Sequence, residues 1–277
     1  MKSSAETFSG RVIAFKMGMV ARLLAMAALL GVTGMILGRV VEPVWAAMKE
    51  REPALSLRST AAAAGNGALL AILGGFRTIL ADGLWIRLYA GWERREIAGT
   101  DALVRLVTAV DPRPAYFWQN GARILAYDLA DWRVHEAGGY EVLGEVGRRS
   151  IEEEQARAAI AHLDAAMPFH AENPDLWIER ATIALNRLHD FEMAAESYRH
   201  AWELPRGPYY AARLHAEVLR RDGRRAEALA WLVKLHPKLP VEDEAAAAGL
   251  VLNRIRQLEH ELGVSAENVY RPPAPSL

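Results

Sequence analysis

The sequence has 277 residues, of which 52% are hydrophobic, and its formal net charge is −1. Because so small a charge produces no strong global field, we do not expect nucleic acid or a strongly acidic substrate as a partner. Cysteine is absent, which excludes disulfides, thiolate metal sites and a cysteine nucleophile. Abundant alanine, leucine, arginine and glutamate predict an all-α fold, and no segment alternates cleanly enough to predict a strand.

The amino-terminal part is predicted to carry a membrane anchor. A basic leader, residues 1–17, precedes an uncharged run at 23–38. At about 1.5 Å per residue this run spans about 24 Å, and flanking residues extend it toward a hydrocarbon core of about 30 Å. We therefore predict a transmembrane helix over residues 18–41. The alternatives are a buried soluble helix and a cleaved signal peptide, although RVVEP at 39–43 is a poor cleavage site.

The orientation of this anchor rests on its leader, because basic residues flank the span in nearly equal number on both sides. A basic leader before a single anchor ordinarily stays in the cytoplasm, so we expect the rest of the chain to lie outside it. Residues 42–59 read as a juxtamembrane connector with two prolines. The apolar stretch at 60–76 is either a second span or the first helix of a domain at 60–262. Its asparagine and four glycines, and the charges that follow it, favour the helix of the domain.

Helical patterns follow one another from residue 75 onward. Residues 75–114 read as a first helix pair, and the pattern at 115–129 begins a second one. One stripe of this second pattern is formed by Phe117, Gly121 and Ile124. The partner helix is expected at 155–167, ending at a proline. Between the two, residues 130–154 are expected as an insertion at a loop, with a short helix at 140–149.

Residues 174–205 carry the clearest pattern in the chain, two helices back to back. Asn173 is a good cap residue and precedes proline at the first helical position, while Pro205 ends the second helix. The first stripe comprises Trp177, Arg180, Ala181 and Ala184, and the second comprises Phe191, Ala194, Tyr198 and Ala201. The alanines would let the helices approach closely, and the aromatic rings would fill the space around them.

A further helix pair is expected at 209–234, with Asp222 and Gly223 in its turn. The amphipathic segment at 242–262 is expected as a last helix without a partner, as terminal capping helices are. Residues 263–277 are rich in proline and are predicted to form a flexible tail.

The order of residues in 174–205 resembles the tetratricopeptide repeat, a 34-residue pattern with an early tryptophan, small and aromatic positions and a closing proline. It departs from that pattern in three ways. Arg180 stands where the family has leucine, the loop between the two helices is one residue longer, and the closing proline comes one residue early. The anchor, the GGFR and NGA segments and the repeats together resemble membrane-tethered bacterial repeat proteins. The resemblance implies a TPR-like α-solenoid of about four helix pairs.

Such a solenoid implies a scaffold or assembly factor, tethered to the bilayer by a single-pass helix, that holds a protein or peptide in a concave groove. In this family the first helix of each pair lines the groove. Carrying over the groove-facing positions gives these candidate partner-binding residues: Trp118, Ile178, Asn186, Tyr210, Arg213, Glu217, Arg220 and Arg221. The same carry-over adds Ala115, Ala122, Leu125, Asp175, Thr182 and Leu185. The expected partner carries a carboxylate or acidic segment beside an apolar anchor.

The sequence shows no catalytic or cofactor motif, so we expect neither an enzyme nor a bound cofactor or metal. The GNG at 65–67 follows no strand and lacks the third glycine of a dinucleotide-binding loop. A polar row comprises Glu192, Glu196, His200 and Glu203, and it reads as a solvated helix face rather than a metal site. Two alternatives stay open: a constitutive structural subunit of a membrane complex, and an enzyme whose site carries no recognised motif.

Overall fold

The computed structural model describes residues 77–273, and every regular element among them is helical. The all-α prediction is thus confirmed for this part of the chain. The chain divides into two compact units, Met1–Asp82 and Gly83–Leu277. Of the first unit only residues 77–82 are described, so the expected leader, anchor, connector and helix at 60–76 lie outside the described residues. Between residues 77 and 273 no helix has the length and apolar character needed to cross a membrane.

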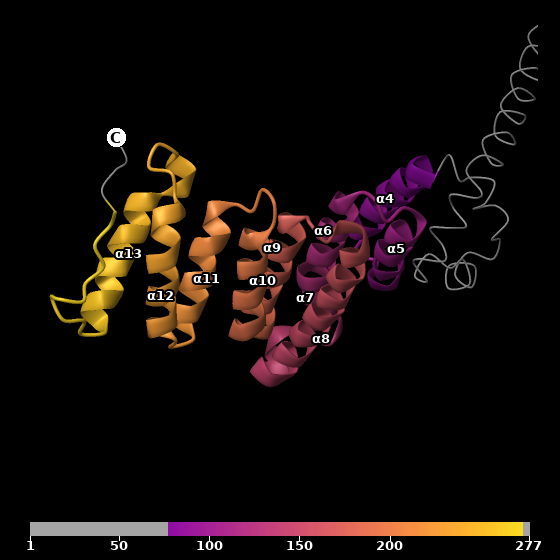
Figure 1. The fold of residues 1–277 in the computed structure, drawn as a ribbon. Helices are drawn as coiled ribbons and strands as arrows, with labels where there is room; N and C mark the ends of the chain where they lie inside the picture. The colour runs from indigo at the N-terminus through magenta and orange to yellow at the C-terminus, as the bar shows by residue number, and fades with distance from the viewer. Residues whose placement is uncertain (1–76, 274–277) are drawn as a thin grey trace, which may run out of the picture. The chain divides into compact units, whose positions relative to one another are not determined.

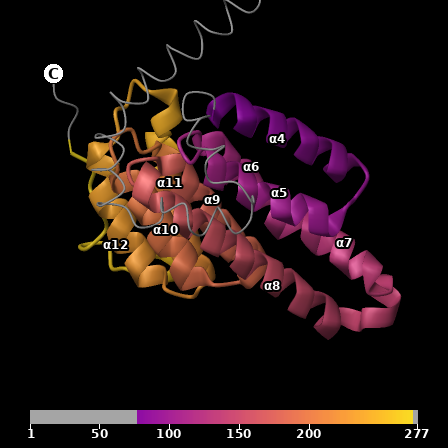
Figure 2. The ribbon, with the colours of Figure 1, turned by 90° about the vertical axis from the view of Figure 1, so that its right-hand side faces the viewer.

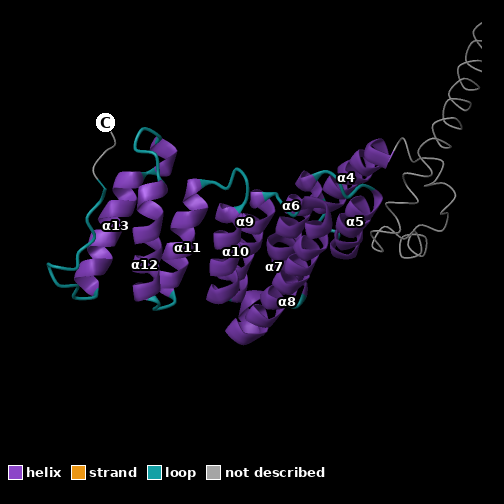
Figure 3. Cartoon of the chain, in the orientation of Figure 1, coloured by secondary structure: helices purple, strands orange, loops and turns teal. Residues whose placement is uncertain are grey.

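The helices are joined mostly by short loops (Figure 3). In chain order they are α4 (Arg77–Glu93), α5 (Ile97–Val110), α6 (Ala115–Arg123), the π-helix η2 (Ile124–Asp128), α7 (Leu129–Glu136), α8 (Gly139–His170), α9 (Pro174–Ile183), the π-helix η3 (Ala184–Leu188), α10 (Phe191–Glu203), α11 (Tyr209–Arg221), α12 (Arg225–Leu235), the 3₁₀ turns η4 (His236–Lys238) and η5 (Glu244–Ala246), and α13 (Ala248–Glu261).

Within the second unit the helices pack as successive pairs. The first helices α6, α9 and α11 each pack against their partners α8, α10 and α12, and α13 packs against α12. Each pair also contacts the next, through α8 with α9 and through α10 with α11. Figure 1 shows α9 to α13 following one another in chain order. The packing therefore brings first helices of neighbouring pairs, such as α6 and α9, into contact.

The central pair, α9 and α10, forms as its sequence predicts. The Asn173 side chain accepts a hydrogen bond from the backbone N–H of Asp175 at 3.0 Å, and Pro174 occupies the first helical position. Ala181, Ala194 and Ala201 are fully buried, and α9 and α10 pack against each other. The alanine stripes therefore allow the close approach that the pattern indicated.

Arg180 occupies the position where the resemblance calls for leucine, and the structure shows what replaces the apolar contact. Its Nη1 donates to Ser197 Oγ at 2.7 Å, and its Nε donates to Asp164 Oδ1 at 2.9 Å. These partners lie on α10 and α8, so one guanidinium joins three helices. The hydrogen bonds of Arg180 thus take the place of the apolar packing that leucine provides in the repeat pattern.

The expected insertion at 130–154 is instead a helical extension of the second pair. α6, η2 and α7 run on continuously to Glu136, and α8 then begins at Gly139 and packs along α7. Figure 2 shows α7 and the first part of α8 side by side, away from the other pairs. Gly138 and Gly144 have positive φ angles, which glycine adopts easily. The turn before α8 lies at Gly138, and a kink inside α8 lies at Gly144. The predicted helix at 140–149 falls within α8 but is interrupted at Gly144, whose φ of 60° and ψ of −175° are not helical, and α8 then runs past Pro168 to His170.

The carboxyl-terminal helix starts six residues later than predicted, at Ala248 instead of Glu242. The Asp243 side chain caps the short 3₁₀ turn η5, and Ala247 adopts a left-handed φ of 48°, which separates η5 from α13. Beyond α13, the backbone N–H of Tyr270 donates to Glu259. The Tyr270 hydroxyl lies 3.1 Å from His236 Nδ1. The tail expected to be flexible is thus held against η4 and α13 as far as Tyr270.

Candidate partner-binding groove

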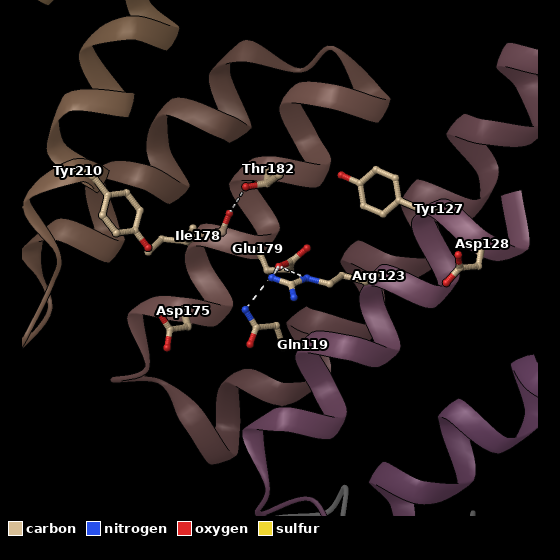
Figure 4. Close-up of a pocket in the computed structure, with 9 residues that line it drawn as sticks. All are labelled: Gln119, Arg123, Tyr127, Asp128, Asp175, Ile178, Glu179, Thr182 and Tyr210. Carbon is tan, nitrogen blue, oxygen red and sulfur yellow. Dashed lines mark hydrogen bonds and ion pairs between the residues drawn. The ribbon is translucent and has the colours of Figure 1, made fainter. Parts of the chain in front are cut away.

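The first helices of three successive pairs line one cavity of about 460 Å³, the first cavity. Its side chains come from α6 with η2, from α9 and from the start of α11, and Figure 4 shows them converging. The lining residues are Gln119, Arg123, Tyr127, Asp128, Asp175, Ile178, Glu179, Thr182 and Tyr210. Residues up to 91 positions apart in the sequence, from Gln119 to Tyr210, therefore share one site.

An ion pair between α6 and α9 forms the floor of the first cavity. Glu179 is only 5% exposed, and Arg123 lies across from it with Nη2 at 2.6 Å and Nε at 2.7 Å from Glu179 Oε2. Gln119 Nε2 donates to the same oxygen at 3.5 Å. The hydrogen bond to Glu179 raises the pKa of Arg123. A buried carboxylate is thus compensated by one guanidinium, as burial of a charge requires.

Tyr127 enters the first cavity from the π-helix η2. The guanidinium of Arg187, in the second π-helix η3, lies 4.5 Å from the centre of the Tyr127 ring. Arg187 Nη1 is also 3.3 Å from Glu152 Oε1 on α8. Burial is the main cause that raises the pKa of Tyr127, and a hydrogen bond with Asn186 opposes it. Tyr127 therefore presents a neutral hydroxyl to the cavity and already binds a cation on its ring.

The opposite end of the first cavity is formed by α9 and α11. Tyr210 is 42% exposed, and its pKa is raised by burial and then by the nearby Asp175 carboxylate. Ile178 and Thr182 both line this end of the cavity, and Thr182 Oγ1 donates to the backbone carbonyl of Ile178 at 2.8 Å. This end combines an apolar contact, an aromatic ring and a carboxylate.

A second cavity, of about 270 Å³, lies between α11, α12 and α13. Its lining residues are Arg213, Leu214, Ala216, Glu217, Arg220, Arg221, Leu232, Leu250, Val251, Arg254 and Leu258. Tyr210 of the first cavity and Arg213 of the second are about one helical turn apart on α11, so this helix contributes to both cavities.

Glu217 is the single carboxylate of the second cavity, and several guanidinium groups surround it. Arg220 holds it with two hydrogen bonds, of 2.7 and 2.9 Å, and Arg221 Nε donates at 3.1 Å. Arg254 Nη2 lies 3.7 Å away. Hydrogen bonding to Arg220 is the largest cause that lowers the pKa of Glu217 to about 2. Arg213 instead donates to the backbone carbonyls of Ala245 and Ala246, at 2.9 and 3.0 Å.

The predicted site residues fall into three groups. Ile178 and Tyr210, with Asp175 and Thr182, line the first cavity. Lining the second cavity are Arg213, Glu217, Arg220 and Arg221. Asn186 is exposed beside Tyr127 and lines neither.

Two of the positions carried over to α6, Trp118 and Ala122, are each one residue away from a side chain that lines the first cavity. Trp118 is 5% exposed and donates its indole N–H to the Pro112 carbonyl at 2.7 Å, while Ala122 and Leu125 are fully buried. Gln119 and Arg123, each one residue further on, face the cavity in their place. The sequence did contain one indication of the cavity-lining residues. Arg123 and Glu179 carry complementary charges at the edges of two apolar stripes.

Among residues 77–273 no group of three His, Asp or Glu side chains is arranged to hold a metal ion. His200, in the polar row of α10, packs against Trp177 with ring centres 4.2 Å apart and the ring planes tilted by 54°. Comparisons with models of protein families and with curated proteins find no match to this chain. The candidate site therefore rests on its own geometry.

Proposed function

We propose that this protein is a membrane-tethered scaffold whose TPR-like α-solenoid holds an extended segment of a partner protein across its first helices. The observation that carries the proposal is the convergence of α6, α9 and α11 on the first cavity, with α11 leading on into the second. A ligand that contacts successive helices in this way has to run across the pairs. An extended protein segment does so, because about three residues at about 3.3 Å each span the 8–10 Å between packed helices.

The lining suits a protein segment in its chemistry as well. Ile178 and Leu250 offer apolar contacts, Tyr127 and Tyr210 offer rings with hydroxyl groups, and charged groups stand between them. Such a mixture of aromatic, apolar and charged side chains is typical of protein-binding surfaces. The membrane tether is proposed from the uncharged run at 23–38 alone.

The proposal is tested by site-specific photo-crosslinking of the full chain in native membranes. A photoreactive residue at Ile178, in the first cavity, should crosslink to a discrete protein. The same residue at Glu196, which is exposed on the second helix α10, is the matched control and should not. Equal crosslinking from both positions would favour a constitutive subunit that is covered on several faces. No crosslink from Ile178 would contradict groove binding.

A further inference from the structure

The two cavities carry opposite charge. The first is lined by three carboxylates, Asp128, Asp175 and Glu179, and by one guanidinium, Arg123. Because Arg123 already pairs with Glu179, Asp128 and Asp175 give this lining its net negative charge. Tyr127 and Tyr210 stand beside them at opposite ends of the cavity, as Figure 4 shows. The Tyr127 ring already carries the Arg187 guanidinium, so the two carboxylates and the ring of Tyr210 form the surface suited to a cationic side chain.

The second cavity has the reverse balance. It is lined by four guanidinium groups and one carboxylate, that of Glu217. Arg220 forms the closest ion pair with Glu217, and its two hydrogen bonds satisfy much of that carboxylate. Arg221 and Arg254 remain partly exposed, with 54% and 36% of their side chains accessible. These two groups leave a positive excess beside the apolar side chain of Leu250, which is 59% exposed.

We propose that the groove recognises a basic and an acidic residue of one partner segment, the basic one in the first cavity and the acidic one in the second. This inference rests on the proposed function, because it assigns chemistry to the segment held there. A segment that crosses the pairs moves about 8–10 Å from α9 to α11, and it can also shift by up to about 15 Å along α11 between Tyr210 and Arg220. The two charged residues of an extended partner are therefore about three to five positions apart, at about 3.3 Å per residue.

The opposite charges also select one direction for the bound segment. In the matching direction each partner charge meets an excess of the other sign. In the reverse direction an arginine or lysine would face Arg221 and Arg254, and a carboxylate would face Asp128 and Asp175. Since like charges brought together at an interface are strongly disfavoured, a segment with the reversed order is rejected.

The test is a selection of random twelve-residue peptides, displayed on phage, against the purified full chain in lipid nanodiscs. Enriched peptides should contain Arg or Lys and Asp or Glu three to five residues apart, in one common order. In fluorescence anisotropy, the best peptide should bind at least about tenfold more tightly than the same peptide with these two residues exchanged. Its affinity should fall as salt rises, because the charges involved are partly exposed.

Matched variants assign each charge to its cavity. The double variant Asp128→Asn with Asp175→Asn should remove the preference for the basic residue. The double variant Arg221→Gln with Arg254→Gln should remove the preference for the acidic residue. Two control variants of equal charge change on other surfaces should keep both preferences: Glu192→Gln with Glu196→Gln, and Arg149→Gln with Arg157→Gln. Circular dichroism verifies that each variant is folded.

The outcomes separate this inference from the proposed function. Enriched peptides without the charged pair, or equal affinity for the exchanged peptide, would overturn the inference. Groove binding would still stand if such peptides lost affinity when Ile178 is changed to Arg. If no peptide is enriched and the Ile178 photo-crosslink also fails, both the inference and the proposed function are wrong.

Discussion

His162 shows how the environment of one residue makes stability depend on pH. Its side chain is 6% exposed between α6 and α8, and its Nε2 has no hydrogen-bond partner among the described residues. Trp118 packs against the ring with centres 4.7 Å apart. Burial lowers the pKa of His162 to about 4, with a smaller contribution from Arg105 that Asp101 partly opposes. The folded protein therefore holds this imidazole neutral in a pH range where the unfolded chain protonates it.

We expect the protein to lose stability as the pH falls from about 6.5 toward 4. In that interval the unfolded chain binds the proton and the folded chain does not, so between pH 7.5 and 5 His162 alone costs about 2 kcal/mol. Denaturant unfolding of the full chain in detergent, followed by tryptophan fluorescence, measures the loss. His162→Leu should reduce the pH dependence by about that amount. An unchanged pH dependence in this variant would show that His162 is not the group responsible.

Gly121 shows how one position determines the approach of several helices. A Cβ atom placed there would lie 2.9 Å from Val104 Cγ1 on α5 and 2.9 Å from His162 Nε2 on α8. Both distances are shorter than a normal contact, and a valine methyl and a buried imidazole have little room to move. The glycine is therefore required by tertiary packing, although glycine is a poor helix former.

The variant Gly121→Ala should destabilise the protein even though alanine favours helix by about 1 kcal/mol. Overpacking typically costs 1–3 kcal/mol, so we expect a net loss of up to about 2 kcal/mol in denaturant unfolding. Gly249→Ala, in α13, is the control, because a Cβ there meets no atom within 4 Å. That variant should be neutral or more stable by up to about 1 kcal/mol. Equal stability of the two variants would contradict the close approach at Gly121.

At the scale of the whole molecule, the proposed tether determines on which side of the membrane the groove lies. The basic leader at 1–17 is expected to stay in the cytoplasm. Reporter domains fused after Glu50 and after Ser276 should then both report export. Cytoplasmic signals from both fusions would reverse the orientation. A mature protein that begins beyond Arg39 would show that the apolar run is cleaved rather than retained as an anchor.

Much of the helical architecture followed from the sequence itself, because the signals that produce it are local. The cap at Asn173, the alanine stripe of α10 and the turn at Gly223 depend on residues a few positions apart, and each appears where it was predicted. The helical extension at 130–154 was not predicted, because its glycines are typical of a loop. In the structure only Gly138, Gly139 and Gly144 leave helical geometry. Local patterns identify helices more reliably than they identify how far each helix continues.

Only the tertiary structure decided which side chains share the groove. Successive residues of a helix point about 100° apart, so an alignment error of one position exchanges a buried residue for a groove residue. That error separates Trp118, which is buried, from Gln119, which lines the first cavity. The Arg123–Glu179 pair joins residues 56 positions apart, and no local pattern relates them. The sequence thus determined helices and their caps through short-range periodicity, whereas packing of one pair on the next determined the opposite charges of the two cavities.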